Sequence, residues 1–116
     1  MEWSVSYYEA ENGDMPAREF IKSLPLKLEA KAYWEIGLLE QFGTNLTMPY
    51  SRYMKDGIYE LRIQQASNFA RIFYFFVIGQ KIILTNGFIK RSRKTPTGEL
   101  DKALLYKADY ERRVQS

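Results

Sequence analysis

Residues 58–88, IYELRIQQASNFARIFYFFVIGQKIILTNGF, decide the fold. Residues 58–64 alternate between apolar and polar side chains, which is typical of a half-buried strand. Residues 69–78 are apolar on both faces, which is typical of a central strand, and residues 81–88 form a third strand-like run. Ala66-Ser67-Asn68 joins the first two runs, and Gly79-Gln80 predicts a tight hairpin turn with glycine first. The stretch therefore predicts a three-stranded antiparallel meander.

The segments before the meander predict one strand and two helices. Residues 3–7 alternate like a strand, and Asp14 is the predicted N-cap of a short helix that begins near Pro16. A longer helix begins at Pro25 and ends at Gly43. Its apolar positions at helical spacing are Leu28, Ala32, Ile36, Leu39 and Phe42. Residues 44–57 are interpreted as an irregular loop that ends in a turn at Asp56 and Gly57.

After the meander, Thr95 or Thr97 is the predicted cap of a final helix that packs through Leu100, Leu104 and Ala108. The chain of 116 residues is long enough for one core, so residues 1–116 are predicted to be one domain. The expected class is α+β: an antiparallel sheet of an N-terminal strand plus the three-strand meander, packed by a helical hairpin on one face, with a C-terminal helix.

The composition excludes several kinds of catalytic and metal-binding site. The sequence holds no cysteine and no histidine, so it lacks thiolate ligands, the commonest metal ligand and the usual general base near neutral pH. No metal site and no cofactor are expected, and no glycine-rich phosphate loop or nucleophile–base pair supports a small-molecule enzyme. Residues 1–5 lack the features of a secretory signal, and the longest apolar run is too short to span a bilayer. A cytoplasmic protein without a membrane partner is predicted.

Charge is divided unevenly along the chain. Residues 1–56 hold 6 basic and 9 acidic side chains, whereas residues 57–116 hold 11 basic and 5 acidic ones, which gives −3 and +6. A positive C-terminal half favours a polyanionic partner, although many ordinary domains show such an asymmetry on a solvated surface.

Arg71 is the least expected residue of the central strand, because it shares a face with Phe69, Phe73 and Phe75 by alternation. A desolvated guanidinium needs a partner. One interpretation is a structural ion pair with Glu60 on the neighbouring strand, and the other is a phosphate site. The residues alone leave both open.

Further polar residues surround this position. Glu60 and Arg62 lie on the polar face of the adjacent strand, where a solvated face is the simpler interpretation. The segment Lys90-Arg91-Ser92-Arg93-Lys94 follows the last strand and is either an exposed loop or a patch that grips a nucleic-acid backbone. If the three strands are adjacent, Glu60, Arg62 and Arg71 share one sheet face close to the basic segment.

The sequence resembles the phage-derived HigB-type toxins of the RelE superfamily over nearly its whole length. The matching pieces are Asp56-Gly57-Ile58-Tyr59-Glu60-Leu61-Arg62-Ile63, Ala70-Arg71-Ile72-Phe73-Tyr74-Phe75-Phe76, Asn86-Gly87-Phe88-Ile89-Lys90-Arg91, Lys94-Thr95-Pro96 and Glu99-Leu100-Asp101-Lys102-Ala103. The resemblance implies a microbial RNase fold with an open sheet face toward RNA. It also implies a toxin of a type II toxin–antitoxin system that cuts mRNA on the ribosome, without metal, by 2′-hydroxyl attack on the phosphodiester.

The resemblance further implies partners and site residues. The partner is a HigA-like helix-turn-helix antitoxin, in a heterotetrameric complex that binds operator DNA, and the target is mRNA on the ribosome. Arg71 corresponds to the central-strand arginine that stabilises the phosphate. The implied catalytic set is Arg71, Arg62, Glu60, Lys90 and Lys94, with Arg91 and Arg93 as RNA-binding residues.

Three questions stay open at this point. The general base is Glu60, a lysine with a lowered pKa, or ribosomal RNA, because the chain has no histidine. Tyr106 and Tyr110 are interpreted as helix-packing aromatics rather than stackers or acids. The alternative functions are a ParE-like gyrase inhibitor with the same fold and a ribosome or nucleic-acid binder without catalysis.

Overall fold

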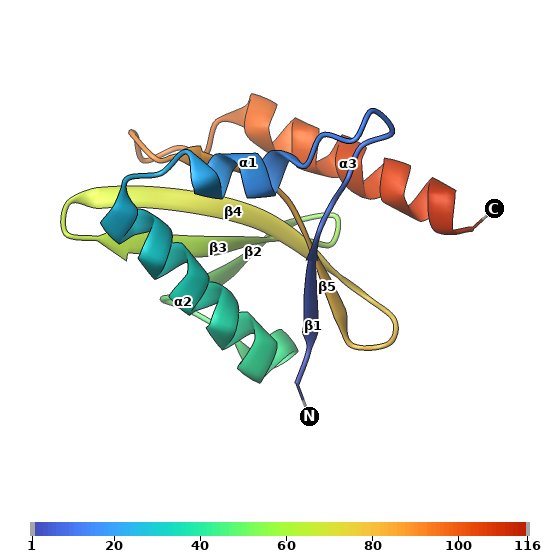
Figure 1. Cartoon of the computed structure of the whole chain (residues 1–116), viewed down its shortest axis with the longest axis horizontal. Coiled ribbons are helices and arrows are strands. Elements are labelled where there is room, and N and C mark those ends of the chain that lie inside the picture. The colour runs from blue at the N-terminus through green and yellow to red at the C-terminus, as the bar shows by residue number, and fades with distance from the viewer. Residues whose placement is uncertain (1, 116) are drawn as a thin grey trace.

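The computed structural model describes residues 2–115. Its helices and strands are β1 (Ser4–Tyr7), α1 (Pro16–Lys22), α2 (Leu26–Phe42), the 3₁₀ turn Gly43–Asn45, β2 (Ser51–Lys55), β3 (Ile58–Gln65), β4 (Asn68–Val77), β5 (Lys81–Ile89) and α3 (Thr97–Val114). Figure 1 shows one twisted sheet with α1 and α2 in front of it and α3 along its upper rim. The α+β class and the three-strand meander are confirmed.

The sheet has five strands in the order β1-β5-β4-β3-β2, so β4 is central as predicted. β3, β4 and β5 are antiparallel neighbours, but β1 pairs with β5 in parallel. The prediction of a wholly antiparallel sheet was therefore wrong at this edge. After β1, the helices α1 and α2 cross one face of the sheet, and the chain re-enters the sheet at the opposite edge as β2. A long crossover of this kind permits parallel pairing of β1 with β5.

Residues 44–57 were predicted to be an irregular loop, but they include the edge strand β2. β2 pairs with β3 in an antiparallel hairpin, and Lys55 lies opposite Ile58. Asp56 and Gly57 form the turn between them, both with positive φ, as the predicted turn requires. An Asp-Gly pair between two short runs is a strong hairpin signal, and it marked β2 in the sequence.

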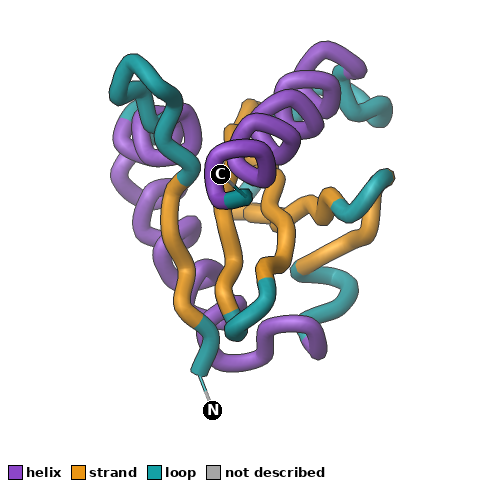
Figure 2. The backbone as a smooth tube through the Cα atoms, turned by 90° about the vertical axis from the view of Figure 1, so that its right-hand side faces the viewer, coloured by secondary structure: helices purple, strands orange, loops and turns teal. Residues whose placement is uncertain are grey.

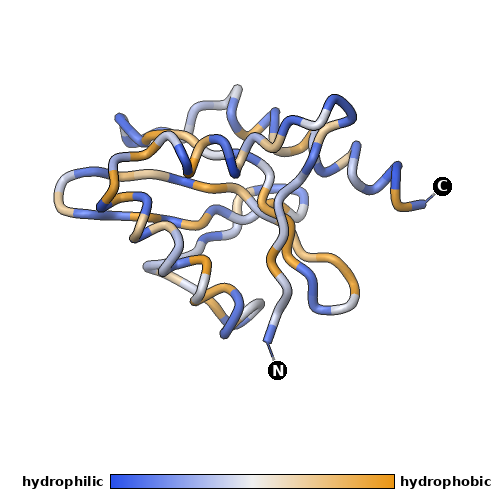
Figure 3. The backbone as a smooth tube through the Cα atoms, in the orientation of Figure 1, coloured by the Kyte–Doolittle hydropathy of each residue, from blue (hydrophilic) through white to orange (hydrophobic). Residues whose placement is uncertain are grey.

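Helices cover both faces of the sheet, not one as predicted. α1 and α2 pack on a face that includes Leu61, Ile72 and Leu84. On the other face, Phe73 and Phe75 belong to the same core cluster as Ala103 of α3. Figure 2 shows the strands between the N-terminal helices and α3, and Figure 3 shows hydrophobic residues concentrated in the strands, as two buried faces require.

Several details of the helix ends differ from the predictions. The N-caps are Met15 for α1 and Pro96 for α3 rather than Asp14 and Thr95 or Thr97, and neither N-cap makes a side-chain capping hydrogen bond. In α1 the Glu19 carboxylate accepts a hydrogen bond from the Met15 backbone N–H at 2.9 Å. On α3 the buried residue is Ala103, while Ala108 is exposed. Within residues 2–115, no helix is long and apolar enough to cross a membrane.

Candidate functional site

β3 and β4 bring the predicted polar residues onto one face of the sheet. Arg62 lies directly opposite Arg71 in the antiparallel register, and Glu60 lies opposite Phe73. Side chains on alternate residues of a strand share a face, so all three project to the side that α3 partly covers. The prediction that Glu60, Arg62 and Arg71 share one face is confirmed.

Arg71 and Glu60 form a buried ion pair. The side chain of Arg71 is 6% exposed and that of Glu60 is 2% exposed, and Arg71 Nε lies 3.5 Å from Glu60 Oε1. Arg71 Nη1 also donates a hydrogen bond to the Ala70 carbonyl at 3.0 Å. The ion-pair interpretation of Arg71 is confirmed, and the interpretation of Glu60 as part of a solvated face was wrong. The segment before α3 covers Glu60, with Thr95 Oγ1 lying 3.4 Å from Glu60 Oε2.

The ion pair leaves Arg71 able to bind a further anion. A guanidinium carries five N–H donors in a planar fork, and the Ala70 carbonyl and Glu60 engage only part of it. Burial lowers the pKa of Arg71, with Glu60 opposing the shift and Arg62 adding to it. Burial therefore disfavours the charged form of Arg71, and an added anion would stabilise that form.

Lys90 approaches the same pair from the end of β5. Its backbone N–H donates to the Phe69 carbonyl at 2.8 Å, and its Nζ donates to the Arg93 carbonyl at 3.1 Å and to Thr95 Oγ1 at 3.4 Å. Burial lowers the pKa of Lys90, Glu60 opposes this, and Arg71 adds to the lowering. Lys90 is thus a cation whose proton is held less tightly than usual.

An open hollow of about 480 Å³ connects Arg71 to the basic segment. Its lining residues are Arg62, Phe69, Arg71, Lys90, Arg91, Ser92 and Arg93. Lys94 is exposed and does not line this hollow, although its carbonyl accepts a hydrogen bond from Ser92 at 3.1 Å. Six of the seven predicted residues therefore lie at or around one place, and Lys94 lies beside it.

Arg52 is a member of this cluster that the sequence analysis missed. It lies on β2 directly opposite Glu60. Its charge acts on both Arg71 and Lys90, lowering the pKa of each. It was missed because residues 44–57 were interpreted as a loop, whereas the Asp-Gly turn would have placed Arg52 on a strand beside Glu60.

We call Arg52, Arg62, Arg71, Lys90 and Glu60 the cation cluster. Its four cations and one carboxylate give a formal charge of +3 (+4 − 1). Like charges directly opposite each other on neighbouring strands are destabilising, and Arg62 and Arg71 form such a pair. An anion bound between them would relieve this repulsion, and the planar fork of a guanidinium suits the oxygens of a phosphate-like group.

Glu35 on α2 is a second residue that the sequence analysis missed. It is 2% exposed, and its Oε1 has no hydrogen-bond partner. Burial raises its pKa to about 7, against the opposing charges of Lys31 and Arg71. Its position was a usable signal, because Glu35 lies three residues after Ala32 and four before Leu39, within the core-facing stripe of α2.

The pKa of Glu35 predicts a pH dependence of stability. A carboxyl whose pKa rises from 4.5 to about 7 on folding binds its proton more tightly when folded, so the free energy of unfolding falls as pH rises from about 4.5 through about 7. In Glu35→Gln, the fall in the free energy of unfolding with rising pH is expected to be smaller by roughly 1–3 kcal/mol. This variant is therefore expected to be more stable than the wild type at pH 8. Urea unfolding of both proteins between pH 5 and pH 8 measures this difference. If the free energy of unfolding depends on pH in the same way in both proteins, Glu35 does not bind a proton more tightly in the folded state.

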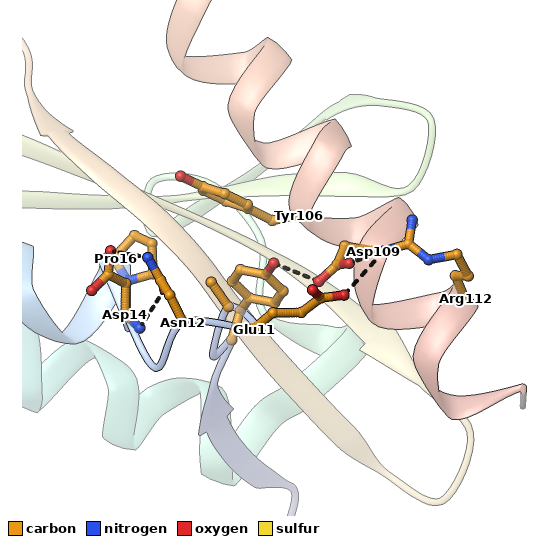
Figure 4. A pocket seen from close by; sticks show the side chains of 9 residues that line it. Glu11, Asn12, Asp14, Pro16, Tyr106, Asp109 and Arg112 are labelled. Carbon is orange, nitrogen blue, oxygen red and sulfur yellow. Dashed lines mark hydrogen bonds and ion pairs between the residues drawn. The ribbon is translucent and has the colours of Figure 1, made fainter.

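A larger hollow, about 540 Å³, lies at the other end of the molecule between the loop after β1 and α3. Figure 4 shows Glu11, Asp14 and Asp109 around it. Tyr8 donates a hydrogen bond to Asp109 at 2.6 Å, and Arg112 pairs with Asp109 and, at 3.9 Å, with Glu11. Carboxylates with internal partners do not favour a phosphate, so size alone does not make this hollow the functional site.

The aromatic residues of α3 serve packing. Tyr106 stacks on Tyr8 with ring centroids 4.7 Å apart, and Tyr110 meets the edge of Phe75 at 5.5 Å. The interpretation of Tyr106 and Tyr110 as helix-packing aromatics is confirmed. Among residues 2–115, no three acidic side chains are grouped in a way that would hold a metal ion.

Comparison with models of protein families finds a match over most of the chain. The model of a family described as "Phage derived protein Gp49-like (DUF891)" matches residues 19–107. The matched part includes α2, the strands β2 to β5 and every residue of the cation cluster. No curated protein matches the chain.

Proposed function

The chain belongs to the phage-derived Gp49-like family, and from this membership and the cation cluster we propose that it is a toxin of a type II toxin–antitoxin system that cleaves mRNA on the ribosome. The observation that carries the proposal is the +3 cluster with Arg62 opposite Arg71 on a partly open sheet face. An RNA phosphodiester is the anion that best explains a hollow lined by cations and continued by a basic segment.

The proposed reaction takes place between the RNA, the side chains of the protein and a base. The 2′-hydroxyl loses its proton to a base, its oxygen forms a bond to the adjacent phosphorus, and the bond from phosphorus to the 5′-oxygen breaks. The 5′-oxygen takes up a proton, so the products are a 2′,3′-cyclic phosphate and a 5′-hydroxyl. Charge builds on the non-bridging oxygens during the step, and fixed cations there lower the barrier.

We assign roles within the cation cluster accordingly. Arg71 binds the non-bridging oxygens through its unengaged donors, and Arg62 and Arg52 add positive charge beside it. Lys90, with its lowered pKa, protonates the 5′-oxygen. Glu60 holds Arg71 rather than acting as the base, because its two oxygens face Arg71 and Thr95. The base is then a group of the ribosome.

The exposed basic residues serve docking in this proposal. Arg91 and Arg93 line the hollow beside Lys90, and Lys94 is exposed next to them. Such residues contact RNA phosphates and make binding dependent on salt. The proposed partner that restrains the toxin is a HigA-like helix-turn-helix antitoxin, in a heterotetramer that binds operator DNA.

Pulse labelling after induction in a bacterial host tests the proposed function. Incorporation of labelled amino acids is expected to stop within minutes, before incorporation of labelled thymidine falls, because mRNA is the target. Co-expression of the neighbouring gene is expected to restore growth. If thymidine incorporation stops first, the chain acts as a gyrase inhibitor, and if neither stops, it is a binder without catalysis.

A further inference from the structure

Beside the cation cluster lies a second hollow, of about 360 Å³, that the cleavage chemistry does not use. Its lining residues include Lys31, Glu35, Tyr50, Arg62 and Gln64. A smaller hollow, lined by Arg62, Gln64, Phe69 and Arg71 together with Pro49, lies between it and the cluster. Arg62 lines all three hollows, so they lie next to one another, and we call this row of hollows from the basic segment past Arg71 to α2 the groove.

The end of the groove at α2 has a buried carboxylate without a partner. Glu35 is 2% exposed and lines the hollow, and its Oε1 accepts no hydrogen bond. A buried polar atom without a partner costs about 1–3 kcal/mol, so it calls for a ligand that donates to it. Above its pKa of about 7 the Glu35 carboxyl is ionised and only accepts hydrogen bonds, so a ligand that binds it there is a hydrogen-bond donor.

The same hollow has an aromatic wall and a cation. Tyr50 lines it, is 37% exposed, and meets the edge of Trp34 with centroids 6.3 Å apart. Lys31 lies four residues before Glu35 on the same face of α2, and its Nζ lies 4.5 Å from the centre of the Trp34 ring. Aromatic faces stack on unpaired RNA bases, while nearby polar groups read the edges of those bases.

We propose that this hollow is a nucleobase subsite that selects guanine in the RNA strand whose phosphate the cation cluster binds. Guanine presents two neighbouring donors, N1–H and N2–H, with the O6 acceptor beside them. Glu35 accepts from both donors, Lys31 donates to O6, and Tyr50 stacks on the ring. The subsite rests on the proposed function, because it places a base next to the phosphate held by Arg71 and Arg62.

The other RNA bases fit this hollow less well. Adenine and cytosine place a ring-nitrogen acceptor beside their amino group, and this acceptor would face the second oxygen of Glu35. Uracil offers one donor between two acceptors. A bidentate pair with a base edge typically discriminates by about tenfold or more. The chemistry of Glu35 therefore separates guanine from all three.

Fluorescence anisotropy at pH 8, where Glu35 is ionised, tests the subsite with labelled pentaribonucleotides. The probes are UUGUU, UUAUU, UUUUU and UUIUU, in which inosine differs from guanine only by the missing N2 amino group. The wild type is expected to bind UUGUU about tenfold more tightly than the other three. Glu35→Gln is expected to lose the preference for UUGUU, because the amide replaces one of the two acceptors with a donor and no longer matches both guanine donors. Glu29→Gln, the same chemical change earlier on α2, is the control and is expected to keep the preference.

The possible results distinguish a failure of the guanine subsite from a failure of the proposed function. Equal binding of all four probes by the wild type, or a guanine preference that survives Glu35→Gln, would overturn the subsite. Arg71→Ala is expected to weaken binding of every probe, and unchanged binding by this variant would overturn the assignment of the phosphate site instead. If Glu35→Gln keeps the preference but slows cleavage of every message equally, Glu35 acts in the chemistry and the subsite is wrong.

Discussion

Arg71→Ala is expected to slow mRNA cleavage by about a hundredfold or more in a reconstituted translation system. The substitution removes the only cation of the cluster that is both buried and directly opposite Arg62. Fixed donors at the place where phosphate charge develops act only if they are positioned before the reaction. Single-turnover cleavage of a defined mRNA on programmed ribosomes measures the effect.

The prediction needs controls because Arg71→Ala also leaves Glu60 buried without its partner. Arg71→Ala combined with Glu60→Gln removes that stray charge and is expected to fold while remaining equally inactive. Arg18→Ala removes an exposed arginine of α1 and is expected to cleave as the wild type does. Cleavage by the double variant within threefold of the wild type would show that Arg71 has no role in the chemistry.

Glu60→Ala is expected to lower the free energy of unfolding by about 3–5 kcal/mol, the largest stability effect predicted for the site. It leaves the Arg71 guanidinium, which is 6% exposed, next to Arg62 and Arg52 without its carboxylate. Denaturant unfolding followed by circular dichroism measures the change.

A variant that replaces both partners separates the contribution of the ion pair to stability from that of side-chain packing. Glu60→Leu combined with Arg71→Met removes both buried charges, and this double variant is expected to be more stable than Glu60→Ala alone. A loss below about 1 kcal/mol for Glu60→Ala would mean that Glu60 does not hold Arg71 in place. Glu60 would then become a candidate for the general base.

The meander and the pairing of Arg71 with Glu60 were predictable because both depend on local rules. Alternation identified β3, the apolar run identified β4, and the short turns between the runs made antiparallel pairing the natural outcome. A guanidinium in an apolar strand has few ways to be satisfied, and a glutamate on the neighbouring strand was the nearest.

Most of the features that were not predicted depend on contacts between segments that are distant in the sequence. Parallel pairing of β1 with β5 and the packing of α3 on the second sheet face involve residues about 20 to 80 positions apart, and no local pattern encodes them. The hollow beside Glu35 is of the same kind, because helical spacing places Glu35 in the buried stripe of α2 but says nothing about whether a cavity lies beyond it. Arg52 is different, since the Asp56-Gly57 turn marked its strand and the signal was present in the sequence.

The family match covers some of these features and not others. It spans residues 19–107, so α2 with Glu35 and the whole cation cluster lie inside it, whereas β1 and the end of α3 lie outside. The groove from Arg71 to Glu35 is therefore formed within the matched part of the chain, and the acidic hollow beside Asp109 is formed largely outside it.

In the proposed function, the cation cluster cleaves mRNA on the ribosome. Primer extension on a defined mRNA, with and without programmed ribosomes and with analysis of the new ends, tests this proposal. We expect cuts only when ribosomes are present, with a 2′,3′-cyclic phosphate on one product and a 5′-hydroxyl on the other. A message that stays intact on ribosomes treated with folded protein would contradict it.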